Sequence, residues 1–146
     1  MSTTTVAKAI PNEPKVVAGE LVGEVFTDAL PSEDPVLYGR ADIEPKGGFE
    51  ARSAQTFRLT YTVGRHGMDD TGSLRVVIRS VGDWGRFQTN NPVAPNYVTA
   101  TASNGAGLSV EYASRGGQRP RNKALTVMVT RGCLREGDTV TVVFGD

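Results

Sequence analysis

The residue types on which most metal sites depend are scarce in this chain of 146 residues. It has one histidine, His66, and one cysteine, Cys133. A lone cysteine cannot close an internal disulfide, and a zinc site usually takes three or four protein ligands. His66 lies three and four residues before Asp69 and Asp70, but short carboxylates between two strands are more typical of turns than of metal sites. The sequence therefore predicts neither a disulfide nor a bound metal.

Motifs for covalent catalysis and for cofactor binding are also missing. The chain has no phosphate-binding loop, no Gly-x-Gly-x-x-Gly segment that opens a helix and no Cys-x-x-Cys pair. A nucleophilic Ser or Cys needs a base such as His within hydrogen-bond reach, and a lone Cys is more often a small buried apolar residue, as we expect of Cys133. We therefore predict no catalytic residue and no cofactor.

The chain has neither a net charge nor a long apolar run. Its 16 basic residues balance its 16 acidic residues, so no overall field favours nucleic acid or an anionic membrane. No stretch approaches the roughly 20 apolar residues of a membrane-spanning helix, and the first 15 residues lack the apolar centre of a signal peptide. These properties predict a cytoplasmic protein that binds neither nucleic acid nor membranes.

Charge is nevertheless divided unevenly along the chain. Residues 1–50 hold nine acidic and four basic residues, whereas residues 51–146 hold seven acidic and twelve basic residues. Three interpretations stay open: the acidic leader packs near the basic part, each half meets a different neighbour, or the leader is simply solvated.

Apolar residues alternate with polar residues over most of the chain. Phe57, Leu59, Tyr61 and Val63 alternate with Arg58 and two threonines, and the same period of two recurs at residues 74–79. This period is typical of half-buried strands. Further strands are expected at residues 39–43, 97–102, 108–112, 124–130 and 140–144, with a possible one at 23–27.

These segments are separated by turn-forming residues and not by helices, apart from a turn expected near residues 32–37. The Asn104-Gly105 dipeptide predicts a hairpin. We therefore predict an all-β fold, an antiparallel immunoglobulin-like β-sandwich of seven to eight strands over residues 21–146. Residues 1–20 are expected to form a flexible or docked arm.

Two segments are candidates for contact with other molecules. The first is the densest run of positive charge, with Arg115, Arg119, Arg121 and Lys123 among Gly and Pro residues. Guanidinium groups can fork onto a phosphate or carboxylate of a ligand or a protein partner. Solvation of a long hairpin tip is the alternative.

The second candidate segment is an irregular, aromatic-rich connection that begins near the only tryptophan. Its candidate contact residues are Asp83, Trp84, Arg86, Phe87 and Tyr97. Buried aromatic rings would pin this loop to the sandwich, and exposed ones would form an interface, because Trp, Tyr and Arg contribute much of the energy of protein interfaces. One loop can do both.

Several motifs together resemble a known family. They occupy residues 59–64, 67–74, 83–85, 91–98 and 137–146. The region from residue 39 onward resembles the N-terminal part of a large bacterial family of unknown function. Longer members of that family continue into a part that looks like a PHP-type metal-dependent hydrolase, for which this sequence has no matching residues.

The resemblance implies a non-catalytic accessory or interaction domain that shapes, covers or oligomerises an adjoining hydrolase-like part. The expected partner is a protein or the missing C-terminal part of the same protein. Homo-oligomer formation is also expected, through an exposed sheet edge after Phe144. Two alternatives stay open: a subunit or fragment of the hydrolase, and a free-standing module that binds anionic ligands.

Overall fold

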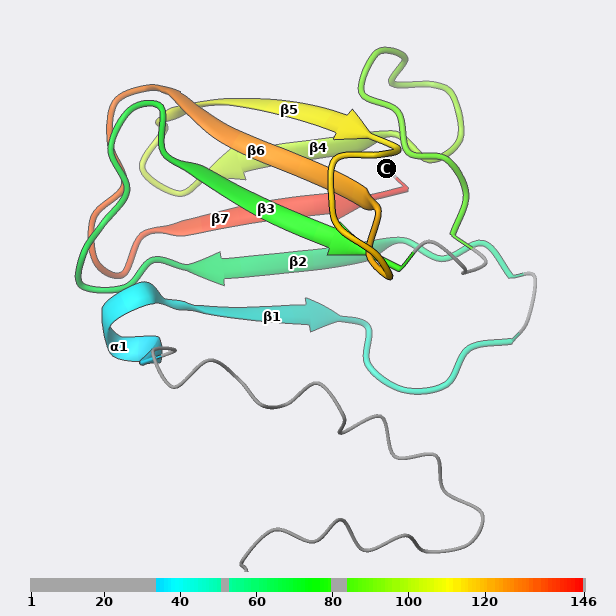
Figure 1. Cartoon of the computed structure of the whole chain (residues 1–146), viewed down its shortest axis with the longest axis horizontal. Coiled ribbons are helices and arrows are strands. Elements are labelled where there is room, and N and C mark those ends of the chain that lie inside the picture. Colours follow the sequence, from blue (N-terminus) through cyan, green and yellow to red (C-terminus); the bar gives the residue numbers. More distant parts are fainter. Residues whose placement is uncertain (1–33, 51–52, 80–83, 146) are drawn as a thin grey trace, which may run out of the picture. The chain divides into compact units, whose positions relative to one another are not determined.

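Two β-sheets lie face to face in the computed structural model of this chain (Figure 1), which describes residues 34–50, 53–79 and 84–145. One sheet has the strand order β1-β2-β7-β4 and the other β3-β6-β5, and the pairings within them are antiparallel. The predicted all-β antiparallel sandwich is confirmed. Its strands are β1 (Arg40–Glu44), β2 (Phe57–Thr62), β3 (Ser73–Ile78), β4 (Val98–Ala102), β5 (Gly107–Ala113), β6 (Lys123–Arg131) and β7 (Thr139–Phe144).

The strand order differs from that of a constant-type immunoglobulin domain. That domain pairs strands 1-2-5-4 in one sheet and 3-6-7 in the other. Here the fifth and seventh strands have exchanged places. The layered architecture is therefore immunoglobulin-like, whereas the connectivity is not.

The exchange places the last strand in the middle of a sheet. On β7, Thr141 pairs with Thr60 of β2 on one side and with Thr101 of β4 on the other. The expectation of an exposed sheet edge after Phe144 is therefore wrong, because β2 and β4 already satisfy both sides of β7. The edges of this sheet are β1 and β4.

The Asn104-Gly105 turn also differs from expectation. It joins β4 to β5, which belong to different sheets, so the predicted hairpin is wrong. The turn itself forms, with Gly105 at a φ of +78° and its N–H donating to the carbonyl of Ala102. A tight turn fixes the local backbone but not the strand with which each neighbour pairs.

The core lies where the inner faces of the two sheets meet. Val142 aligns with Leu59 of β2 and Ala100 of β4, and Leu125 aligns with Val76 of β3 and Tyr112 of β5. Val142 and Leu125 are completely buried. Their burial follows from the period of two, which sends alternate side chains inward.

One short helix precedes β1. This α1 (Pro35–Tyr38) begins with Asp34, whose side chain accepts a hydrogen bond from the N–H of Val36 at 2.8 Å. Gly39 ends the helix at a φ of +93°, and a Cβ there would lie 2.2 Å from the carbonyl oxygen of Thr62. This region agrees with the turn predicted near residues 32–37, of which residues 32 and 33 lie outside the described part.

Two expectations fall on residues that the structure does not describe: the arm at residues 1–20 and the possible strand at 23–27. Within the described ranges, no helix has the length and apolar character needed to cross a bilayer.

Candidate interaction surfaces

Six aromatic side chains meet at the end of the sandwich where β2 begins and β7 finishes. We call this group the aromatic end, and it consists of Phe49, Phe57, Trp84, Phe87, Tyr112 and Phe144. The Trp84 ring is central, with centroid distances of 5.0 Å to Phe57, 5.7 Å to Phe87 and 6.3 Å to Phe144. These rings join strands of both sheets to the loop that follows β3.

Exposure changes sharply across the aromatic end. Phe87 and Phe144 are 4% exposed, whereas Trp84 is 39% and Phe49 is 42% exposed. Phe49 reaches the group through an edge-on contact with Phe57 at 5.2 Å. Trp84 is thus held by the core on one side and open on the other, which is the arrangement of a preorganised contact residue.

The loop after Trp84 is organised by Gln88. Its side-chain amide donates to the carbonyls of Asn91 and Ala94, and its side-chain carbonyl accepts from the N–H groups of Asn90 and Asn91. Sequence reasoning missed Gln88, because nothing in the local pattern distinguishes a glutamine that closes a loop from a solvated one. It missed Phe49 as well, which stands outside any strand.

The remaining predicted residues of this loop are placed less centrally. Arg86 is exposed, and Tyr97 is half-buried with its carbonyl accepting from the N–H of Gly145 at 2.9 Å. The rings in contact with Trp84 are those of Phe57, Phe87 and Phe144. Asp83 lies outside the described residues.

The basic segment forms the connection between β5 and β6, and it folds back on its own sheet. Gly117 donates to the carbonyl of Asn122 at 2.9 Å, and a Cβ on Gly116 would lie 3.0 Å from the Cβ of Ala124. Ala124 points to the outer face, yet it is only 1% exposed, because this loop covers it. The loop is therefore an ordered cover and not an extended tip.

The basic side chains on this loop remain accessible. Arg115, Arg119 and Arg121 are exposed and Lys123 is half-buried at the start of β6. The loop backbone thus lies over the outer face of the three-stranded sheet and carries exposed arginines.

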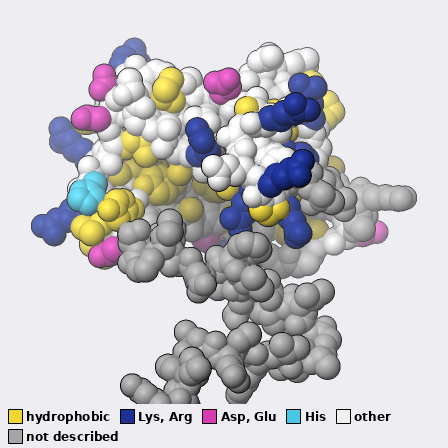
Figure 2. Space-filling view, in the orientation of Figure 1, with side chains coloured by type: hydrophobic (Ala, Val, Ile, Leu, Met, Phe, Trp, Pro, Cys, Tyr) yellow, Lys and Arg dark blue, Asp and Glu magenta, His cyan; other side chains and the backbone are white. Residues whose placement is uncertain are grey.

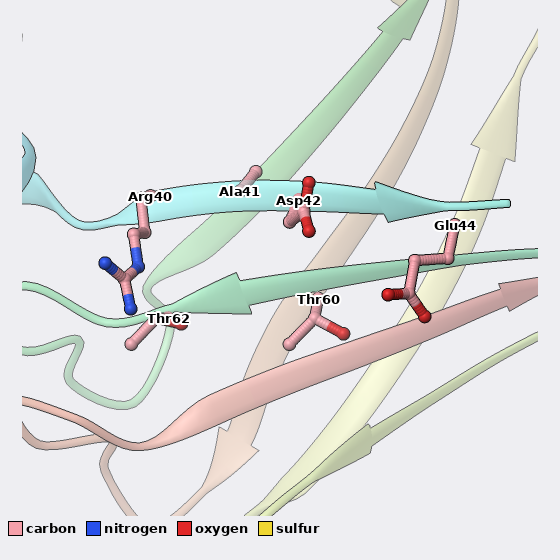
Figure 3. Close-up of a pocket in the computed structure, with 6 residues that line it drawn as sticks. All are labelled: Arg40, Ala41, Asp42, Glu44, Thr60 and Thr62. Atoms are coloured by element: carbon pink, nitrogen blue, oxygen red, sulfur yellow. The ribbon is translucent and has the colours of Figure 1, made fainter. Parts of the chain in front are cut away.

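A polar hollow of about 500 Å³ lies beside β1 on the other sheet, and sequence reasoning did not anticipate it (Figure 3). Asp42 is bonded to Lys46 at 2.7 Å, and this hydrogen bond is the main reason that its pKa lies below the ordinary value. Mixed charges and hydroxyls suit solvation, and the hollow presents no arrangement of nucleophile and base. Its lining residues are Arg40, Ala41, Asp42, Glu44, Thr60 and Thr62.

His66 and Cys133 are the two remaining residues with a reactive or metal-binding side chain. His66 is exposed and its ring lies 5.4 Å from that of Tyr38. Cys133 is exposed and free, so the expectation of a buried thiol is wrong. It follows Gly132, where a φ of +86° turns the chain outward at the end of β6. No group of three or more His, Cys, Asp or Glu residues in the described ranges is placed to hold a metal ion.

Comparisons of the chain with protein-family models, with curated proteins and with solved structures gave no match. The resemblance to the bacterial family therefore stays a prediction that depends on the motifs named above.

Proposed function

We propose that this chain is a non-catalytic β-sandwich interaction domain that uses its aromatic end to dock onto an adjoining hydrolase-like part. The proposal places the protein in the cytoplasm, with a protein partner and no cofactor. The family resemblance supports the choice of partner, and the aromatic end supports the place of contact.

The observation that carries the proposal is the half-exposed ring of Trp84 on a fully packed base. A tryptophan that already lies against Phe57 and Phe87 loses little conformational freedom on binding. Phe49 widens the exposed aromatic area beside it. Few surface residues offer as much contact area at as small an entropic cost.

The position of the C-terminal strand supports the same surface. Phe144, the last residue of β7, is itself part of the aromatic end. A part that follows the sandwich in a longer relative would therefore start beside Trp84, which favours a contact at this end over one at the α1 end (Figure 1).

The test mixes this protein with the separately produced hydrolase-like part of a longer family member and measures affinity by calorimetry. Trp84→Ala is expected to weaken binding by about 30-fold, the effect of a central tryptophan worth about 2 kcal/mol. Phe49→Ala is expected to weaken it by less, because its ring contacts Phe57 alone among the described aromatic residues. Tyr38→Ala is the matched control, an aromatic residue 54% exposed at the opposite end.

Because Trp84 packs on the core, each variant is first checked for an unchanged circular dichroism spectrum and cooperative unfolding. Phe49→Ala keeps the test decisive if Trp84→Ala does not fold. Equal binding by Phe49→Ala, Tyr38→Ala and the unaltered protein contradicts the proposal, and so does the absence of any binding.

A further inference from the structure

The outer face of the three-stranded sheet has a charge and a composition that the proposed function does not use. Residues 73–79 and 107–131, which form β3, β5, β6 and the loop between the last two, contain seven basic residues and one acidic residue, a net charge of +6. The three strands by themselves hold three basic residues and one acidic residue, and the four strands of the other sheet hold two basic and two acidic residues, so the β5–β6 loop and Arg79 supply most of the difference. The two layers therefore differ in charge.

The basic residues of this sheet come together from separate parts of the sequence. Arg75 and Val77 of β3 and Arg79, which follows β3, are exposed at alternate positions. The loop that carries Arg115 and Arg119 lies on the same face of the sheet. Figure 2 shows Lys and Arg side chains gathered on the half of this face where the β5–β6 loop lies. We call this surface the basic face.

Four arginines of the basic face have no ion pair with a carboxylate in the described part of the chain. Glu111 of β5 is separated from Arg75 by Thr126 of the central strand in the strand register. Across the described ranges, the ion pair within 4.0 Å joins Lys46 to Asp42, on the other sheet. The guanidinium groups of Arg75, Arg79, Arg115 and Arg119 therefore have no described carboxylate as a partner.

Apolar side chains are exposed within the same surface. Val77 of β3 is 42% exposed and alternates with half-buried residues, and Met128 of β6 is 39% exposed and alternates with buried residues of the inner face. Protein interfaces are enriched in Arg and Met and depleted in Lys. The basic residues of the outer face and its loop include the arginines Arg75, Arg79, Arg115, Arg119 and Arg121, whereas Lys123 is in register with the inward Ile78. The composition resembles that of a protein interface.

A nucleic acid fits the basic face less well. Single-stranded nucleic acids stack their bases on aromatic side chains. The outward residues of β3, β6 and β5 include Ser73, Arg75, Val77, Ala124, Thr126, Met128, Thr130, Ser109, Glu111 and Ala113. None of these is aromatic. The exposed apolar side chains of Val77 and Met128 would also lie against a charged phosphate backbone and gain no binding free energy there.

We propose that the basic face docks an acidic protein surface that carries apolar side chains among its carboxylates. Arginine side chains at the rim of the face fork onto the carboxylates, while Val77 and Met128 pack against the apolar side chains of the partner. This contact is independent of the aromatic end, since the two surfaces share none of their named residues.

The test uses three fluorescein-labelled probes of equal net charge with the full chain at low salt. One is a peptide in which pairs of glutamates alternate with single leucines, one is an all-glutamate peptide, and one is a single-stranded DNA. We expect the glutamate–leucine peptide to bind tightest by fluorescence anisotropy. The double variant Arg75→Ala/Arg79→Ala is expected to weaken its binding by about tenfold, as two partly solvated ion pairs allow.

Two further variants separate the proposal from general electrostatics. Arg65→Ala/Arg135→Ala removes the same charge from exposed arginines outside the basic face and is expected to change binding by less than about twofold. Met128→Ala is expected to weaken binding of the glutamate–leucine peptide by about threefold and to leave the all-glutamate peptide unaffected. Met128→Ala also keeps the proposal testable if the arginine double variant does not fold.

The proposal is overturned if DNA or the all-glutamate peptide binds as tightly as the glutamate–leucine peptide, or if both arginine double variants have the same effect. It is also overturned if light scattering shows a dimer that Arg75→Ala/Arg79→Ala dissociates, because the occupant would then be a second copy. None of these results bears on Trp84, so the proposed function stands or falls separately.

Discussion

Replacement of Val142 by alanine tests the position of β7 in the centre of its sheet. Val142 is fully buried between Leu59 and Ala100 in the strand register. The change removes two buried methyl groups, which costs about 1.6 kcal/mol in transfer free energy, and the remaining cavity raises the loss to about 2–3 kcal/mol. Val93→Ala removes the same atoms from a side chain that is 93% exposed and is expected to cost less than about 0.5 kcal/mol.

Urea unfolding followed by tryptophan fluorescence measures both variants. Trp84 is the only tryptophan and packs on Phe57 and Phe87, so its emission reports loss of the core. With a slope of about 1.5 kcal/mol per molar urea, Val142→Ala lowers the midpoint by about 1.3–2 M, and Val93→Ala by less than about 0.3 M. Similar shifts in the two variants would refute the reasoning, because a seventh strand at a sheet edge, as in the immunoglobulin order, would bury this valine less.

Two further predictions concern the basic loop and the alkaline limit of stability. Gly117→Ala places a Cβ 2.0 Å from the carbonyl oxygen of Arg121, so we expect it to lower the free energy of unfolding by more than about 1 kcal/mol. The control Gly48→Ala places its Cβ in open space and is expected to change that free energy by less than about 0.5 kcal/mol. Equal urea midpoints of the two variants would show that the loop is not folded as described. Burial raises the pKa of Tyr61 above its ordinary value of 10.0, so the native state holds this proton more tightly than the unfolded state. The resulting stability is present below the unfolded pKa and is lost as the pH rises through the raised pKa. Unfolding free energies measured across this alkaline range should fall more steeply for the unaltered protein than for Tyr61→Phe, and parallel curves would exclude the effect.

The candidate contact residues were only partly predictable. The sequence predicts Trp84 and Phe87 as contact residues, because they are large aromatic residues in an irregular loop. Phe49 was missed, since its contact with Phe57 depends on how the chain between β1 and β2 returns to the sheet. The period of two at residues 74–79 predicts only that Arg75 is on the polar side of a half-buried strand. The folded loop above the sheet shows that it belongs to the same surface as Arg115.

The strands and their inward faces follow from the sequence by itself. All seven expected segments begin and end within about two residues of the observed strands, because alternation is a property of the local backbone: successive side chains of an extended chain point to opposite sides.

Tertiary structure alone decided which strands pair. Nothing local to residues 139–144 or to the Asn104-Gly105 turn specifies that β7 lies between β2 and β4, or that β5 joins the opposite sheet. Pairing depends on burial summed over both sheets and on the routes open to the connecting loops. The same pairing places the arginines at and after β3 on one face with those of the β5–β6 loop, because β3 and β5 both flank β6.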